Sequence, residues 1–158
     1  MTPTGTLRAT ATGVDLELTR SISASREDVW ASLTDSDRTE RWYGPWERVS
    51  DGEVRVQMAF EEGAPWFDMT LRTCEAPSLL AVSMGDEWHL DVSLTENDSV
   101  TTLLFIHHLT KTEGIGEIGP GWEYYLDMLI ASREGAALPS FDDYYPSQQE
   151  YYESLSPR

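Results

Sequence analysis

Cysteine is almost absent from this chain. Cys74 is the single cysteine among 158 residues, which excludes an internal disulfide bond and suits a reducing cytoplasm. The first residues lack the basic stretch and apolar run of a secretory signal. No window approaches the ~18 consecutive apolar residues of a membrane span. The sequence therefore predicts a cytoplasmic protein without membrane insertion.

Positive charge is also scarce. The chain carries 11 Lys and Arg residues against 28 Asp and Glu residues, and its formal net charge is −17. Nucleic acids and anionic membrane surfaces are bound through basic patches, so this balance argues against both as partners. An acidic surface favours solubility and basic or neutral partners.

Motifs of nucleotide, hydrolase and metal chemistry are missing. The sequence has no P-loop, no G-x-S-x-G and no zinc spacing, so we expect no cofactor and no metal site. Gly114 to Gly119 do read G-x-G-x-x-G. No strand follows the next helical segment, however, so the βαβ unit of a dinucleotide site is lacking. We expect this run to be a flexible connection that could gate a cavity.

The chain does contain a regular series of strand and helix patterns. Short apolar segments, several with a period of two, predict strands at 7–10, 14–23, 54–60, 66–74, 79–84, 88–95 and 100–109. Ser25 to Asp28 match a capping box and predict a short helix, and Ser36 begins a second one that stops at Gly44-Pro45.

The longest helical pattern lies late, at Gly119 to Arg133. Trp122, Leu126 and Leu129 recur there at the spacing of one broad apolar face. A meander of strands needs a cover for one face. We therefore predict one α+β domain spanning 1–158, with a core of about 7–134. Residues 135–158, rich in tyrosine and acidic side chains, are expected to pack back on that core.

Three blocks resemble a known family. They are Val29 to Asp35 (VWASLTD), Arg41 to Trp46 (RWYGPW) and Gly121 to Leu126 (GWEYYL), with a strand closing on His107 before the last block. Across roughly positions 14 to 134, they are similar to bacterial homologues of the activator of heat-shock-protein-90 ATPase. That family belongs to the START-like (SRPBCC) superfamily. The resemblance implies a helix-grip fold, in which a curved antiparallel sheet wraps around a long C-terminal helix and two short helices follow the first strand.

The resemblance also implies an apolar cavity between sheet and helix. The sequence leaves open whether this space is a cavity or a filled core, in which His107 would be a core histidine hydrogen-bonded near the last helix. The candidate ligand-binding residues are the aromatic, methionine, leucine and histidine side chains expected there: Trp42, Met58, Trp66, Met69, Trp88, Phe105, His107, Trp122, Tyr125, Leu126 and Leu129. His107 and His108 point to opposite faces of a strand, so they do not jointly bind a metal. Both phases of this strand are apolar, which leaves its register open, and the family pattern favours His107 as the inward residue.

Three functions are compatible with these features. The first is non-catalytic binding of a small hydrophobic or aromatic ligand, with His107 as a polar anchor. The second is a co-chaperone-like role, in which the acidic surface docks on a chaperone. The third is a polyketide cyclase or dehydratase, for which His107 is the one acid–base candidate. No catalytic residue is assigned, and the oligomeric state stays open.

Overall fold

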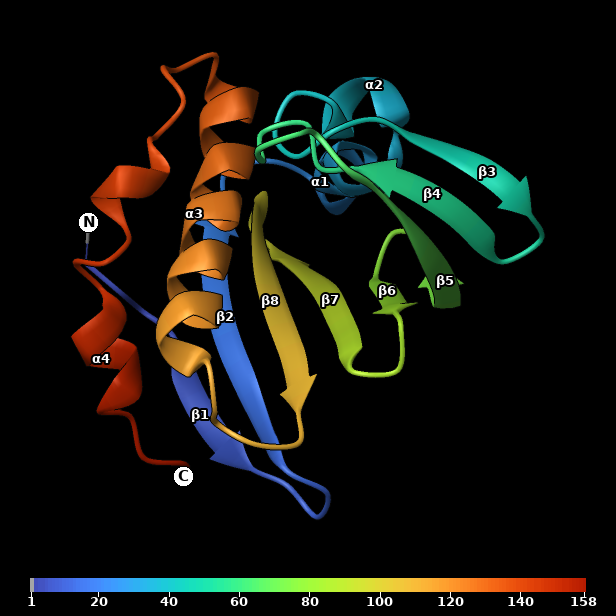
Figure 1. Cartoon of the computed structure of the whole chain (residues 1–158). Coiled ribbons are helices and arrows are strands. Elements are labelled where there is room, and N and C mark those ends of the chain that lie inside the picture. The colour runs from blue at the N-terminus through green and yellow to red at the C-terminus, as the bar shows by residue number, and fades with distance from the viewer. Residues whose placement is uncertain (1) are drawn as a thin grey trace.

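An open antiparallel sheet wraps around one long helix in the computed structural model, which describes residues 2–158 (Figure 1). The strands, in chain order, are β1 (Thr6–Ala9), β2 (Val14–Ile22), β3 (Trp46–Ser50), β4 (Glu53–Gln57), β5 (Trp66–Glu75), β6 (Leu79–Met84), β7 (Trp88–Asn97) and β8 (Val100–Leu109). Their order in the sheet is β1-β2-β8-β7-β6-β5-β4-β3, and each neighbouring pair is antiparallel. The expected α+β helix-grip architecture is confirmed.

The helices are α1 (Arg26–Thr34), α2 (Ser36–Thr39), α3 (Ile115–Glu134), the 3-10 turn η1 (Phe141–Asp143) and α4 (Gln149–Glu153). Ser25 caps α1, since its hydroxyl accepts a hydrogen bond from the Asp28 amide at 3.2 Å. The pair α1 and α2 carries the chain from β2 to β3, at the far edge of the sheet. Both short helices follow β2 rather than β1, because a β1–β2 hairpin precedes them.

The alternating side chains of β8 show which residues of the sheet lie on its concave face, the face toward α3. Leu103, Phe105 and His107 point toward α3 and are buried, whereas His108 lies on the convex face. Paired residues of an antiparallel sheet share a face, so this phase extends from strand to strand. The core between the concave face and α3 includes Leu7, Leu16, Leu18, Leu90, Leu94, Leu103, Leu126 and Leu129.

The glycine-rich run before the late helix differs from expectation. Gly116 and Gly119 lie inside α3, which begins at Ile115, so the run is not a flexible connection. The reason is close packing. A Cβ atom on Gly119 would lie 2.3 Å from the ring of Tyr152, and one on Gly116 would lie 2.7 Å from Glu153. Glycine therefore occurs here because another segment approaches the helix backbone.

Two strands also differ from the sequence prediction. Trp46–Ser50 forms the edge strand β3, which was not predicted because its mostly exposed side chains show no alternation. β4 ends at Gln57 rather than at 60. Beyond that point the Ala59 amide bonds to the Tyr43 carbonyl, so the chain leaves the β4–β5 ladder.

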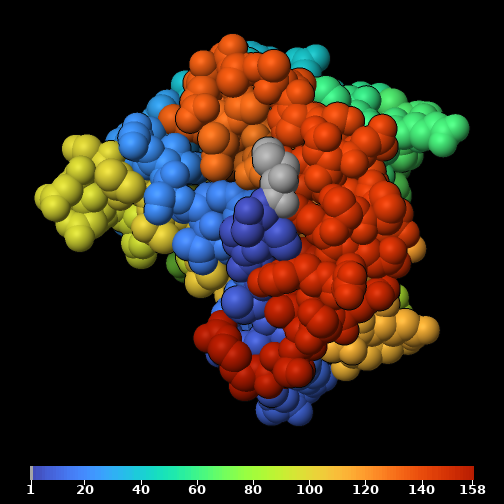
Figure 2. Space-filling model, turned by 90° about the vertical axis from the view of Figure 1, so that its left-hand side faces the viewer, coloured from blue at the N-terminus to red at the C-terminus, as the bar shows by residue number. Residues whose placement is uncertain are grey.

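The C-terminal segment, residues 135–158, lies along the face of α3 that points away from the sheet. Figure 2 shows it beside the first residues of the chain. Tyr144 and Tyr152 are fully buried there. The Ala9 amide donates to the Arg158 carbonyl at 2.9 Å, and the Arg158 amide donates to the Leu7 carbonyl at 3.0 Å, so the last residue pairs with the edge strand β1.

Candidate functional site

Five of the candidate residues meet in an aromatic cluster between β7, β8 and α3: Trp88, Phe105, His107, Trp122 and Tyr125. The ring centroids of Phe105 and Trp122 lie 4.5 Å apart, and those of Trp88 and His107 lie 4.6 Å apart. Trp122 is 5.8 Å from Trp88 and 6.5 Å from Tyr125. The strand period of two aligns Phe105 with His107, and the i, i+3 spacing aligns Trp122 with Tyr125.

His107 is the polar centre of this cluster. Its side chain is buried, and its Nδ1 accepts a hydrogen bond from Trp122 Nε1 at 3.1 Å. An indole N–H can only donate, so Nδ1 carries no proton and the neutral ring holds its proton on Nε2. Nε2 has no hydrogen-bond partner among the described residues. The site therefore contains a buried, oriented donor that the protein itself leaves unused.

The environment keeps His107 neutral. Burial, followed by the neighbouring imidazoles of His108 and His89, lowers the pKa of His107 to about 4. At neutral pH the ring is therefore uncharged, and its Nε2–H is a permanent donor rather than a titrating one.

The β4–β5 connection closes one side of the cluster. Tyr125 on α3 donates its hydroxyl to Glu61 Oε2 at 2.9 Å, which ties the helix to this connection. Met58 lies in the same connection and is half-buried, and Met69 of β5 packs against the core. A role of either methionine in ligand binding stays a prediction.

Trp66 does not face the space between sheet and helix. Val56 pairs with Phe67, so Phe67 shares the concave face and Trp66 lies on the convex face, with its ring 5.2 Å from the Arg55 guanidinium. Phe67, 44% exposed at the rim, is the residue that the sequence interpretation missed. Which of these two neighbouring aromatic residues faces the helix is decided by the pairing register of β5 with β4. The sequence of β5 alone does not reveal that register.

Trp42, Leu126 and Leu129 are core residues. All three are buried, and Trp42 Nε1 donates to the Ser32 carbonyl at 2.8 Å. All three belong to the hydrophobic core, and the ring contact of Trp42 is with Tyr43 rather than with the aromatic cluster. Their role in ligand binding stays a prediction.

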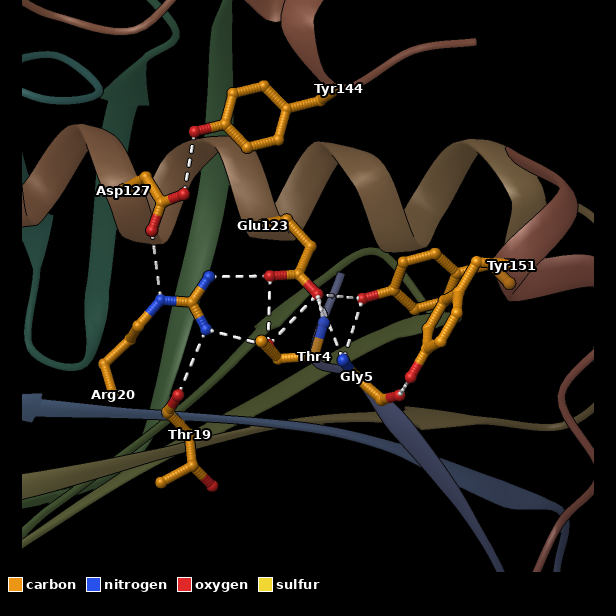
Figure 3. Close-up of polar contacts among 9 residues, drawn as sticks. Thr4, Gly5, Thr19, Arg20, Glu123, Asp127, Tyr144 and Tyr151 are labelled. Carbon is orange, nitrogen blue, oxygen red and sulfur yellow. Dashed lines mark hydrogen bonds and ion pairs between the residues drawn. The ribbon is translucent and has the colours of Figure 1, made fainter. Parts of the chain in front are cut away.

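A second polar site lies on the other side of α3. Glu123 is buried, and its carboxylate accepts from Arg20 Nη2 at 2.6 Å, from the Thr4 amide at 2.6 Å and from the Gly5 amide at 3.0 Å (Figure 3). The Tyr152 hydroxyl donates to the same carboxylate. Glu123 lies within the helical pattern, and Arg20 lies in the inward-facing phase of β2. Two opposite charges within these core elements were the sequence signal that could have predicted this ion pair.

Two surface hollows of the described chain lie away from the aromatic cluster. A hollow of about 170 Å³ lies between α1, α2 and the C-terminal end of α3, and a wider one of about 570 Å³ adjoins it beside α2. His107 Nε2 is itself closed off from solvent. A ligand can therefore reach that atom only if a neighbouring side chain moves.

A curved antiparallel sheet closed by a long C-terminal helix, with an aromatic cluster between them, defines a protein of the START-like helix-grip class. The chain belongs to the family described as Activator of Hsp90 ATPase homolog 1-like protein, whose model matches residues 23–132, more than half of the chain. No curated protein matches the chain.

Several solved structures share this fold. CalU16 from Micromonospora echinospora is 21% identical, with a TM-score of 0.75 over 98% of this chain and 96% of that one. The protein of gene BPP1335 from Bordetella parapertussis is 23% identical, with a TM-score of 0.76 over 99% of this chain and 93% of that one. DynU16, a protein in the dynemicin biosynthetic locus, is 21% identical, with a TM-score of 0.67 over 80% of this chain and 50% of that one.

Two searches of the described residues bear on partners and cofactors. None of the helices within residues 2–158 has the length and apolar character that a bilayer crossing requires. In the same range, no group of three or more histidine, cysteine, aspartate or glutamate side chains is arranged to hold a metal ion.

Proposed function

We propose that this protein binds a small apolar or aromatic ligand between the concave face of the sheet and α3, without catalysis of its own. The observation that carries the proposal is the unused Nε2–H of His107 inside an aromatic cluster. A buried donor without a partner costs about 1–3 kcal/mol. A ligand with a hydrogen-bond acceptor on an aromatic body offsets that cost and stacks on the surrounding rings.

Entry of the ligand requires one wall of the cluster to open. Trp88 is the best candidate, because its side chain is 37% exposed at the start of β7 and lies directly against His107. Trp122 is held by its hydrogen bond to His107 Nδ1, so it stays in place as the opposite wall. Trp88 then exchanges its contact with the imidazole for a contact with the ligand.

The test compares two probes of nearly equal shape, acetylnaphthalene, which has a carbonyl acceptor, and ethylnaphthalene, which has none. We expect acetylnaphthalene to bind about fivefold more tightly, as one hydrogen bond of about 1 kcal/mol implies. In His107→Leu, the two probes should bind equally. His108→Gln, which changes the convex face, is the matched control and should keep the preference. Thermal shift and isothermal calorimetry measure both constants.

Equal binding of the two probes by the unmodified protein would contradict the role of His107, and absence of binding by either would contradict the cavity itself. Native mass spectrometry of the protein purified from its host adds an independent observation, because a resident ligand appears as a fixed mass increment that organic extraction removes.

A co-chaperone-like role is the second candidate. Phe60, Trp66 and Phe67 are exposed at one end of the sheet, where apolar side chains suit a protein partner, and the net charge of −17 suits a basic one. A pull-down with the heat-shock-protein-90 chaperone at low and moderate salt tests this role, and absence of binding at both would exclude it.

The enzyme alternative predicts turnover of a polyketide-like substrate that His107→Ala abolishes.

A further inference from the structure

An arginine-lined hollow lies apart from the aromatic cluster, and its lining residues come from α1, α2 with the turn after it, and the C-terminal end of α3. Figure 1 shows these helices near one another. Its lining is Asp28, Ser32, Arg38, Arg41, Ser132 and Arg133. Its volume is about 170 Å³. A water molecule takes about 30 Å³ of liquid, so the hollow has room for a small ion together with part of its hydration shell.

The charge in this hollow is opposite to that of the whole molecule. Three guanidinium groups and one carboxylate line it, in a chain whose net charge is −17. Arg38 Nη1 lies 2.8 Å from Asp28 Oδ1, and Arg133 Nη2 lies 2.6 Å from Asp28 Oδ2, so one carboxylate is shared by two arginines. The positive charge is therefore only partly compensated.

Arg41 supplies the uncompensated charge. Its side chain is exposed, and within residues 2–158 it makes no hydrogen bond or ion pair. Ser32 adds a neutral donor, because its hydroxyl oxygen accepts from Arg133 Nη1 at 2.7 Å while its own proton has no acceptor among the described residues. A guanidinium and a hydroxyl that converge on one hollow match the oxygens of a small oxyanion.

We propose that this hollow binds a small phosphate-type oxyanion, either inorganic phosphate or the phosphate group of a small monoester, with Arg41 as its principal cation. The adjoining wider hollow shares Arg38 and Arg41 but adds the carboxylates of Asp35 and Asp37, whose charge disfavours a polyanion that would extend into it. The site is separate from the proposed ligand cavity, since its lining shares no residue with the aromatic cluster.

The experiment is an NMR titration of the uniformly ¹⁵N-labelled full chain with inorganic phosphate and, separately, with glycerol phosphate. The ionic strength is held constant by replacing sodium chloride. We expect saturable shifts of the amides of α1, α2 and the last turn of α3. Glycerol phosphate should match or exceed phosphate if the biological ligand is a monoester, and should bind more weakly if it is the free ion.

Arg41→Ala and Arg48→Ala form a matched pair of variants. Both remove one exposed arginine without a carboxylate partner, but Arg48 lies on β3, outside the hollow. Arg41→Ala should raise the dissociation constant about tenfold, the usual effect of losing a charged hydrogen bond, and Arg48→Ala should change it less than twofold. Linear shifts that never saturate, shifts scattered over the surface, or equal effects of the two variants would each overturn the proposal.

Discussion

Glu123 shows how a single buried residue joins distant parts of this chain. Its carboxylate holds the first residues through the Thr4 and Gly5 amides, β2 through Arg20 and the C-terminal segment through Tyr152. Burial alone would raise the pKa of Glu123, but the hydrogen bonds from Tyr152, Thr4 and Arg20 outweigh it and hold the pKa below its usual value. The charged form is therefore the one that the fold requires.

Glu123→Gln should lower the free energy of unfolding by about 3 kcal/mol, because buried Arg20 then keeps only Asp127 as a counter-charge and the Thr4 and Gly5 amides lose a charged acceptor. Urea denaturation at neutral pH measures the change. Glu117→Gln, on the exposed side of the same helix, should stay within about 0.5 kcal/mol of the unmodified protein. Since the folded pKa of Glu123 is lowered, its contribution is present above the unfolded pKa and is lost on acidification. Equal stability of the two variants would contradict this account.

At the scale of elements, the packing of α4 on α3 depends on two glycines. Tyr152 lies where a side chain at Gly119 would otherwise project, and the Glu153 and Gln149 side chains lie over Gly116. Glycine at these positions lowers the helix propensity of α3, but it allows close contact with the C-terminal segment.

Gly119→Ala should destabilise the protein by about 1–3 kcal/mol, since the added methyl group meets the Tyr152 ring at 2.3 Å. Gly121→Ala is the control in the same helix, because a Cβ there meets nothing within 4 Å. It should stabilise the protein by about 0.5–1 kcal/mol through helix propensity alone. Thermal unfolding of both variants measures the difference, and two shifts of the same sign would show that α4 does not pack as described.

At the scale of the whole molecule, the convex face of the sheet carries a charge network across three strands. His108 of β8 lies between Asp15 of β2 at 2.7 Å and Asp91 of β7 at 2.9 Å. Burial opposes the charge on His108, but the hydrogen bonds to Asp91 and Asp15 outweigh that effect and raise its pKa. The protonated imidazole thus links the β7–β8 hairpin to β2, which is far from it in sequence.

Because the folded pKa of His108 is raised, its contribution is complete below the unfolded value of about 6.5 and is lost as pH rises through the folded pKa. The difference in unfolding free energy between the unmodified protein and His108→Gln should therefore shrink as pH rises. The side chain is 37% exposed, so solvent screening limits the change to about 0.5–1 kcal/mol. His89→Gln should retain the pH slope, and a constant difference for His108→Gln would contradict the prediction.

Much of the architecture was predictable from local patterns. The period-two strands, the capping box at Ser25 and the long apolar stripe of α3 are local properties, and together they predicted one α+β domain of antiparallel strands covered by the late helix. The helix-grip fold itself was implied by the family resemblance. The inward face of β8 did not follow from its pattern, because both phases of this strand are apolar, and the family resemblance favoured His107. The structure places Phe105 and His107 on the concave face. Edge strand β3 was missed because its exposed side chains leave no periodic signal.

The sequence by itself determined most of the strands and helices, all but edge strand β3 among the strands, because apolar periodicity reflects which side of each element is buried. Only the tertiary structure decided which distant residues meet. Register assigned Phe67 rather than Trp66 to the concave face, the return of the C-terminal segment turned a glycine run into a packing surface, and the approach of α1 to α3 brought Arg41 toward Arg133. Such contacts depend on how elements pack, and a local sequence pattern contains no information on the partner that an element will meet.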